Sequence, residues 1–220
     1  MRTKHQFRYS RVANWVGELI NMNNTNNKFL VIDCETGGLN PEEHSILSCA
    51  GVSLDINSGH IEEVFNYFIK ESSIVACKEA LKNNKINLNY IVECGLEPAE
   101  AVKSITIAVQ REFGIGNQFP IIGHNVGFDI SFLKRLFKIS NQYRTFESVF
   151  KGRSIDTCSV FRFLQLTNQA SNNSTSLTSM LNYAGITYNE KEKHTALGDA
   201  ILTAKAFLAL IKKFNKNKNH

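Results

Sequence analysis

Four acidic residues from three stretches of the sequence are candidates for one metal site. Asp33 and Glu35 end an apolar run, whereas Asp129 and Asp199 lie much later in the chain, each at the edge of a helical pattern. Residues two apart in a β-strand point to the same face of the sheet, so Asp33 and Glu35 would point together, with Cys34 on the other face. Carboxylate oxygens are preferred ligands of Mg²⁺ and Mn²⁺. The pattern therefore predicts that the four side chains converge on a pair of metal ions.

Each motif alone has an ordinary structural explanation. Asp33 and Glu35 could form a solvated strand end, and Asp129 could cap a helix. His194, five residues before Asp199, could be a surface histidine in the polar loop that precedes it. The agreement of all the motifs in order, spacing and expected structural context favours a functional site over these alternatives.

The strands and helices predicted from the sequence would bring these motifs together. Apolar runs separated by turn residues predict three strands in antiparallel order, at 29–33, 46–55 and 61–69. Short strands at 120–123 and 154–157 then alternate with helices, which we place at 98–113, from 129, after 157, at 177–184 and from 198. The expected fold is an α/β domain, in which a mixed sheet is flanked by helices.

Length and composition fit one sizeable domain. The chain has 220 residues, of which 43% are apolar, enough to bury a core. Its five cysteines are odd in number and lack a Cys-x-x-Cys pair, which predicts reduced thiols in a cytoplasmic protein rather than disulfides or a zinc knuckle. No stretch approaches the roughly 20 apolar residues of a membrane span, and the N-terminus lacks the apolar centre of a signal peptide. We expect no membrane association.

The two ends of the chain are basic and the body between them is not. Without residues 1–28 and 212–220, the net charge falls from +5 to about −3. Basic ends favour contact with a polyanion such as nucleic acid, and solubilising tails are the alternative. Residues 1–27 combine an Asn-rich linker with an amphipathic helix, which we expect to dock on the body or, alternatively, to bind a partner. The apolar stripe of that helix consists of Val12, Trp15, Val16, Leu19 and Ile20.

Taken together, the motifs resemble those of the DEDDh (DnaQ-like) 3′-5′ exonuclease family, which includes ribonuclease T and the proofreading exonuclease subunit of bacterial DNA polymerase III. The resemblance covers about residues 28–211 and leaves 1–27 and 212–220 outside the exonuclease domain. A related branch has a tyrosine four residues before the last aspartate, where this chain has Thr195, so the histidine branch fits. The matching residues are, in chain order, Asp33, Glu35, Asp129, His194 and Asp199.

The resemblance implies a ribonuclease H-like fold and a hydrolase that needs two Mg²⁺ or Mn²⁺ ions. Two such ions can clamp the attacking and departing oxygens of a phosphodiester. By this resemblance Asp33 would contact both ions, Glu35 and Asp199 would complete the site at the nucleophile's metal, and Asp129 would hold metal directly or through water. His194 would be the general base, a task that suits an imidazole near neutral pH.

The resemblance also implies substrate contacts and partners. The loop after the first motif would line the terminal nucleotide through Thr36, Gly37 and Leu39. Glycine would let the phosphate and sugar of the nucleotide come close to the protein backbone. Phe128 could stack on the base or, equally, pack in the core. Single-stranded DNA is the favoured substrate and RNA trimming is the alternative. Members of the family associate with a DNA polymerase or form homodimers. A non-catalytic nucleic-acid-binding or polymerase-associated module is the alternative from a different class.

Two further features have competing interpretations. Asp156 could be a fifth acid of the site, but its position between a strand and a helix favours a helix cap. The stretch 140–153, rich in aromatic and basic residues, could extend a nucleic-acid surface, although an exposed loop is the simpler prediction.

Overall fold

The computed structural model describes residues 27–170, 174–190 and 193–217. The predicted N-terminal helix therefore lies outside the described residues. Within the described ranges, five strands form one sheet in the order β3-β2-β1-β4-β5. They are β1 (Lys28–Thr36), β2 (Ile46–Asp55), β3 (Ile61–Phe68), β4 (Ile121–Gly123) and β5 (Ser154–Asp156). The strands β1, β2 and β3 pair in antiparallel fashion, whereas β4 and β5 run parallel to β1. The predicted mixed α/β sheet is confirmed.

The described residues also contain helices on both faces of the sheet. The helices are α2 (Lys78–Asn84), α3 (Leu88–Cys94), α4 (Pro98–Phe113), α5 (Val126–Ile139), α6 (Tyr143–Val149), α7 (Thr157–Leu166), α8 (Leu177–Ala184) and α9 (Ala196–Asn217). None of them is both long enough and apolar enough to cross a membrane, among the residues described. All five cysteines are free thiols, as predicted.

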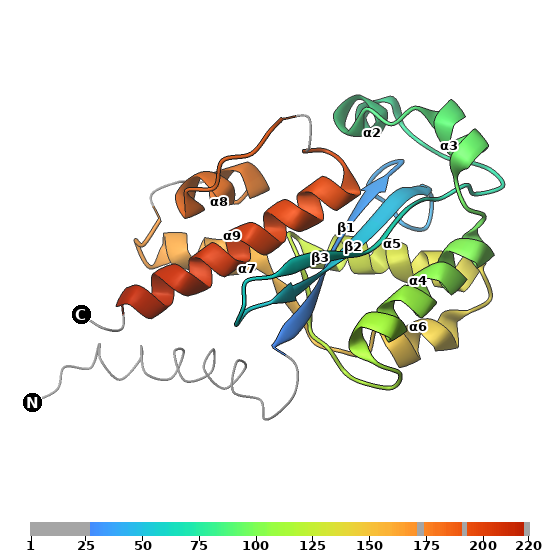
Figure 1. The fold of residues 1–220 in the computed structure, drawn as a ribbon. Coiled ribbons are helices and arrows are strands. Elements are labelled where there is room, and N and C mark those ends of the chain that lie inside the picture. The colour runs from blue at the N-terminus through green and yellow to red at the C-terminus, as the bar shows by residue number, and fades with distance from the viewer. Residues whose placement is uncertain (1–26, 171–173, 191–192, 218–220) are drawn as a thin grey trace, which may run out of the picture.

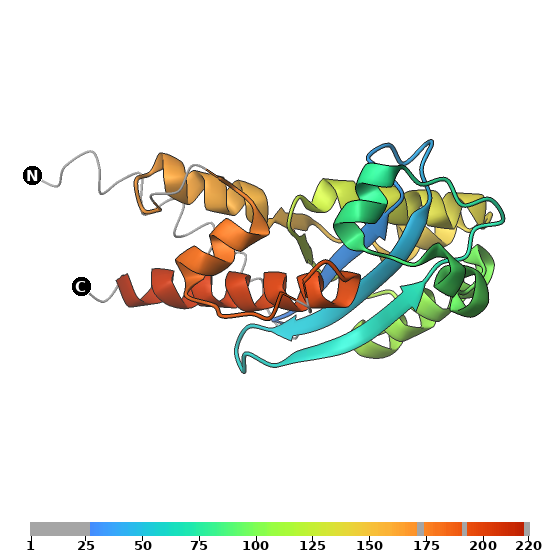
Figure 2. The ribbon, with the colours of Figure 1, turned by 90° about the horizontal axis from the view of Figure 1, so that it is seen from above.

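Two apolar cores cover the two faces of the sheet. Leu30 and Ile32 of β1 pack with α4, α5 and α6 on one face, whereas Phe29 and Val31 pack with α9 on the other. Figure 1 shows α9 crossing its face of the sheet, with α4 and α6 on the opposite side of the strands, at the lower right. A third apolar cluster joins α7, α8 and α9, and Figure 2 shows α7 and α8 set to one side of the sheet. Because β1 is covered on both faces, alternate residues of this strand reach different helices.

The prediction of an exposed loop at 140–153 is wrong. Helix α6 lies within this stretch, and Phe146 and Phe150 are buried in the core beside α5. Their rings lie 5.5 and 5.6 Å from that of Phe137, measured between centroids. The physical reason is the spacing of apolar residues at 146, 149 and 150, which forms one helical face and packs against α5.

Three other details differ from the prediction. Helices α2 and α3 were not predicted, because each has seven residues and buries only one of them, Asn84 and Ile91 respectively. Helix α5 begins at Val126 rather than at Asp129, after Asn125 in left-handed conformation. Helix α9 begins at Ala196 and continues past the predicted domain boundary at residue 211.

Candidate active site

The two acidic residues of β1 lie on the sheet face that α9 covers. Phe29 and Val31 precede them at alternate positions of the strand and pack against α9, whereas Cys34 is buried in the core on the opposite face. Alternation along the strand therefore directs Asp33 and Glu35 toward α9. Both side chains are half-buried.

Asp199 approaches the same place from the first turn of α9. One carboxylate oxygen each from Asp33, Glu35 and Asp199 lies within 4.8 Å of the other two, which is close enough to hold one metal ion. The Oδ1 atom of Asp199 is buried and has no hydrogen-bond partner among the described residues. A buried carboxylate oxygen without a partner is costly, and a divalent cation would satisfy it. The residues present therefore fit a metal ion.

Asp129 reaches the site from the other face of the sheet. It lies in the first turn of α5, and its Oδ1 accepts a hydrogen bond of 2.9 Å from the backbone N–H of Cys34. Strand β4 pairs with β1 only at Leu30 and Val31, so this N–H has no strand partner on that side. The hydrogen bond fixes Asp129 to the backbone between Asp33 and Glu35. All four acids thus come together at the end of β1.

His194 lies in a tight turn just before α9. It has a positive φ of 66°, and it is half-buried. Its backbone N–H lies close enough to the carboxylate of Asp199 to oppose the rise that burial causes in the pKa of that group. The next residue, Thr195, caps α9, because its Oγ1 accepts from the N–H of Gly198 at 3.1 Å. This turn holds His194 beside the acidic cluster.

The environment raises the pKa values of all four carboxyl groups. Burial, with help from the charge of Asp199, raises the pKa of Glu35 to about 7. Burial also raises the pKa of Asp129 to about 8, although the N–H of Cys34 opposes the change. Burial and the charges of Asp129 and Glu35 raise the pKa of Asp33 well above its usual range, and burial raises that of Asp199. Divalent cations would favour the ionised forms.

The predicted substrate residues follow Glu35 in the chain. The side chain of Leu39 is 84% exposed, whereas Thr36 and Gly37 are buried. A Cβ atom on Gly37 would lie 2.2 Å from the carbonyl oxygen of Val75. Glycine is therefore required here by the protein's own backbone, and not only by a substrate. The substrate contacts of these residues stay predictions.

Phe128 packs against the core, which is one of the two roles predicted for it. Its half-buried ring lies against the core on the α5 face, with its centroid 4.9 Å from that of Phe132. Stacking on a base stays a prediction for the remaining exposed part of the ring.

Asp156 caps α7. Its carboxylate accepts hydrogen bonds from the backbone N–H groups of Cys158 and Ser159. It also accepts from the N–H of Asn125 at 2.7 Å, which ties α7 to the turn before α5. Burial opposes its ionisation, but these hydrogen bonds and that of the Ser159 hydroxyl hold the pKa of Asp156 below its usual value.

Sequence reasoning missed the polar residues that hold the loop after Glu35. Asn84 is buried, and its Nδ2 donates to the carbonyl oxygen of Thr36 at 3.1 Å. Glu71 is also buried and bonded to Ser45. These partners lie 48 and 26 residues apart in the chain, so no local pattern could have revealed them.

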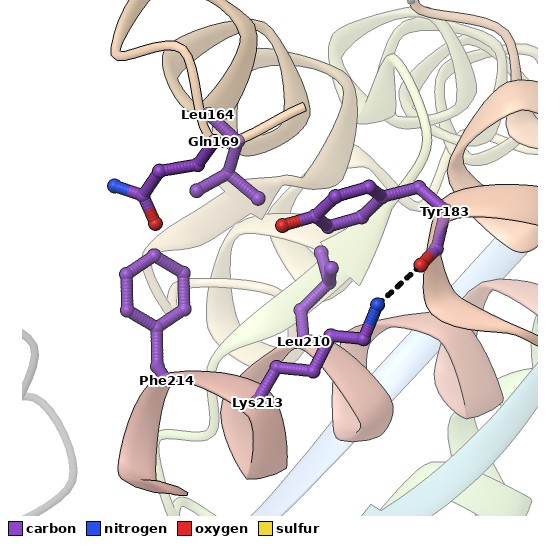
Figure 3. A pocket seen from close by; sticks show the side chains of 6 residues that line it. All are labelled: Leu164, Gln169, Tyr183, Leu210, Lys213 and Phe214. Atoms are coloured by element: carbon purple, nitrogen blue, oxygen red, sulfur yellow. Dashed lines mark hydrogen bonds between the residues drawn. The ribbon is translucent and has the colours of Figure 1, made fainter. Parts of the chain in front are cut away.

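A surface hollow lies away from these acids. Figure 3 shows it between α7, α8 and the C-terminal half of α9, where Lys213 donates a hydrogen bond to the carbonyl oxygen of Tyr183. None of the predicted site residues lines it. Its lining residues are Leu164, Gln169, Tyr183, Leu210, Lys213 and Phe214.

Comparison with known proteins identifies the family. The family model RNase_T, described as exonuclease, matches residues 30–207. The chain belongs to this exonuclease family. It is 27% identical to Ribonuclease T of Wigglesworthia glossinidia brevipalpis over 196 residues, which cover 85% of this chain and 86% of that one. It is 28% identical to DNA polymerase III subunit epsilon of Buchnera aphidicola subsp. Baizongia pistaciae, over 86% of this chain and 76% of that one.

Solved structures agree on the fold of this exonuclease. A crystal structure of E. coli Exonuclease I with a dT13 oligonucleotide superimposes with a TM-score of 0.69 at 19% identity, covering 84% of this chain. The match spans 41% of the length of that chain. The ribonuclease H-like fold class and the DnaQ-like family are thus confirmed, and so is the prediction of a 3′-5′ exonuclease rather than a non-catalytic module.

Proposed function

We propose that this exonuclease uses two divalent cations, Mg²⁺ or Mn²⁺, to release nucleoside 5′-monophosphates from single-stranded 3′ ends. The observation that carries the proposal is the group of three carboxylate oxygens within 4.8 Å, one of them from Asp199, whose buried Oδ1 lacks a hydrogen-bond partner among the described residues. Oxygen-only ligands favour Mg²⁺ or Mn²⁺ over softer metals. The residues that would hold the ions are Asp33, Glu35, Asp129 and Asp199.

The bound ions would neutralise the carboxylates and offset the negative charge that develops on the phosphodiester in the transition state. Asp33 interacts electrostatically with all three other acids and would contact both ions. Glu35 and Asp199 would complete the site on the side of the attacking water, and Asp129 would hold metal directly or through water. The reaction consumes one water and leaves a shortened strand with a free 3′ hydroxyl.

His194 would take a proton from the attacking water. Its turn lies next to Asp199, and the residue is half-buried. An imidazole titrates near neutral pH and can accept a proton without being permanently charged.

The loop after Glu35 would bind the terminal nucleotide. Leu39 offers the most exposed apolar side chain of this loop, and Thr36 and Gly37 offer backbone beneath it. The exposed part of Phe128 would lie against the base.

We favour DNA as the substrate. One relative is a DNA polymerase III subunit epsilon, and the similar Exonuclease I structures contain dT13 and dA16 oligonucleotides. RNA trimming is the second candidate, because several relatives are named Ribonuclease T. A polymerase subunit or, alternatively, a second copy of this chain would be the protein partner, and we expect the enzyme to work in the cytoplasm.

A side-by-side digestion of matched DNA and RNA oligonucleotides tests the proposal. Each strand is labelled at its 5′ end and incubated with Mg²⁺, with Mn²⁺ or with a chelator. We expect a ladder of progressively shortened strands with either metal, no products with chelator, and faster digestion of DNA. Faster digestion of RNA would reverse the substrate preference, and equal activity with chelator would contradict the metal mechanism.

A further inference from the structure

An ion pair with little exposure joins α5, the helix that carries Asp129, to the loop between β3 and α2. The Nη1 and Nη2 atoms of Arg135 on α5 donate to Oε1 and Oε2 of Glu71 at 2.6 and 3.0 Å. The two side chains are only 17% and 7% exposed. Burying a charged pair costs desolvation energy, so such a pair is weak support for stability, while its two parallel hydrogen bonds fix geometry.

Glu71 also holds the start of β2. Its Oε1 accepts from the backbone N–H of Ile46 at 3.1 Å, and its Oε2 accepts from the hydroxyl of Ser45 at 3.0 Å. Its carboxylate therefore accepts four hydrogen bonds from two separate parts of the chain. Arg135 lies six residues after Asp129 on the same helix, so this carboxylate connects the helix of a metal-site acid to Ser45.

Ser45 is hydrogen-bonded in turn to the segment that precedes α2. Its backbone N–H donates to the carbonyl oxygen of Val75, and its Oγ accepts from the N–H of Val75, both at 3.0 Å. Its own carbonyl oxygen accepts from the N–H of Gly37 at 2.7 Å. The carbonyl oxygen of Gly37 accepts in turn from the N–H of Cys77 at 2.7 Å.

This series of hydrogen bonds ends at the backbone of Gly37, in the loop that follows Glu35. Gly37 lies between Glu35 and Leu39, and Val75 covers it so closely that a Cβ atom would not fit. The side chains of Leu39 and Val75 are 84% and 47% exposed. The backbone that carries both of these apolar side chains is thus held in place through Glu71 and Arg135.

We propose that Glu71 and Arg135 are positioning residues for substrate binding. Their ion pair sets the place of the 36–39 loop relative to the helix that carries Asp129. The inference rests on the proposed function, in which the 3′-terminal nucleotide binds against this loop. Loosening the pair weakens binding of the strand end more than it slows hydrolysis, because the metal-site acids keep their own contacts with β1 and α9.

The test is steady-state kinetics of Arg135→Lys on a single-stranded oligonucleotide. Lysine keeps the charge but cannot form the two parallel hydrogen bonds. We expect KM to rise about tenfold and kcat to stay within about twofold, since displacements of about 1 Å can cost up to 10²-fold. The matched control is Lys28→Met, which breaks the Lys28–Glu112 pair at the start of β1. Its KM and kcat should match those of the wild type.

Two further measurements separate positioning from general destabilisation. Hydrogen exchange of the backbone amides of Val75 and Cys77 should become faster in Arg135→Lys, while Mn²⁺ affinity stays unchanged. The double variant Glu71→Gln/Arg135→Met, which leaves no buried charge, should raise KM in the same way and replaces the single variant if that one fails to fold.

An unchanged KM in a folded variant, or a loss of kcat together with Mn²⁺ affinity, would overturn the inference alone. A wild-type protein without metal-dependent activity would overturn the proposed function and this inference with it.

Discussion

The two ends of β1 differ in how their charged side chains are paired. At its start, the Nζ atom of Lys28 lies 2.9 Å from Oε1 of Glu112 on α4, and the hydrogen bond between them raises the pKa of Lys28. At its end, Asp33 and Glu35 lie among other acids, and their pKa values are raised. The first end favours its charged form and the second end disfavours it.

The difference shows that the charges at the start of β1 are stabilised within the protein itself, whereas those at its end are not. The pair at the start needs nothing but the protein, because each charge has an opposite partner. The cluster at the end gathers like charges and leaves one buried oxygen of Asp199 without a partner, so it is unfavourable until cations bind. The end of β1 is therefore organised for a ligand, at a cost to the stability of the metal-free protein.

The largest expected effect comes from Asp33→Asn. We expect the hydrolysis rate with Mg²⁺ or Mn²⁺ to fall by at least about 10³-fold, because the residue that contacts both ions loses its charge. The same change should raise the thermal unfolding temperature of the metal-free protein at pH 8, because it removes a buried carboxyl whose ionisation the folded state disfavours. Rates from a labelled oligonucleotide and a melting curve check the two effects. A variant that keeps full activity would contradict the site.

His194→Asn should have the next largest effect. Asparagine tolerates the left-handed backbone of this turn, so the fold should be retained. Loss of the general base should lower kcat by roughly 10²- to 10⁴-fold and leave Mn²⁺ affinity nearly unchanged. The control is His60→Asn, an exposed histidine beside the β2–β3 turn, which should behave as wild type. Similar kcat values for the two variants would remove His194 from the mechanism.

A smaller effect should appear in the pH dependence of stability. The pKa values of Glu35 and Asp129 are about 7 and about 8 in the folded protein, against roughly 4 in an unfolded chain. Their contribution to stability is complete below about pH 4 and is lost as the pH rises through 7 and 8. Urea unfolding of the metal-free protein should therefore show a loss of a few kcal/mol between about pH 5 and 8.5. Added Mn²⁺ should remove most of this loss, and an identical loss with and without Mn²⁺ would argue against metal binding.

The smallest effect should come from the other end of the strand. Lys28→Met removes a partly exposed ion pair, so the free energy of unfolding should fall by no more than about 1 kcal/mol. Exonuclease activity should not change. A large loss of activity would mean that the two ends of β1 are coupled, contrary to the comparison above.

Local patterns predicted the parts of the fold that local chemistry determines. The apolar run and the turn at 57–59 gave the bounds of β2, and the helix at 177–184 has a Ser176 cap and ends at Gly185 in left-handed conformation. Alternation along β1 predicted the common direction of Asp33 and Glu35. These features depend on residues close together in the sequence.

Contacts between distant residues explain what was missed. Helix α6 becomes clear only when Phe146 meets Phe137 of α5, and the ion pair of Glu71 and Arg135 joins residues 64 positions apart. Gly37 was expected to admit a substrate, but its nearest neighbour is the backbone of Val75, which no sequence pattern places there.

Mn²⁺ binding tests the central claim most directly. Titration of the metal-free protein, followed by calorimetry or by the resonance signal of free Mn²⁺, should give two ions per chain for the wild type. Asp199→Asn should weaken this binding by at least about tenfold, whereas Glu112→Gln, at the other end of β1, should leave it unchanged. Equal binding by the wild type and Asp199→Asn, or no binding by either, would contradict the assignment of the acidic cluster as the metal site.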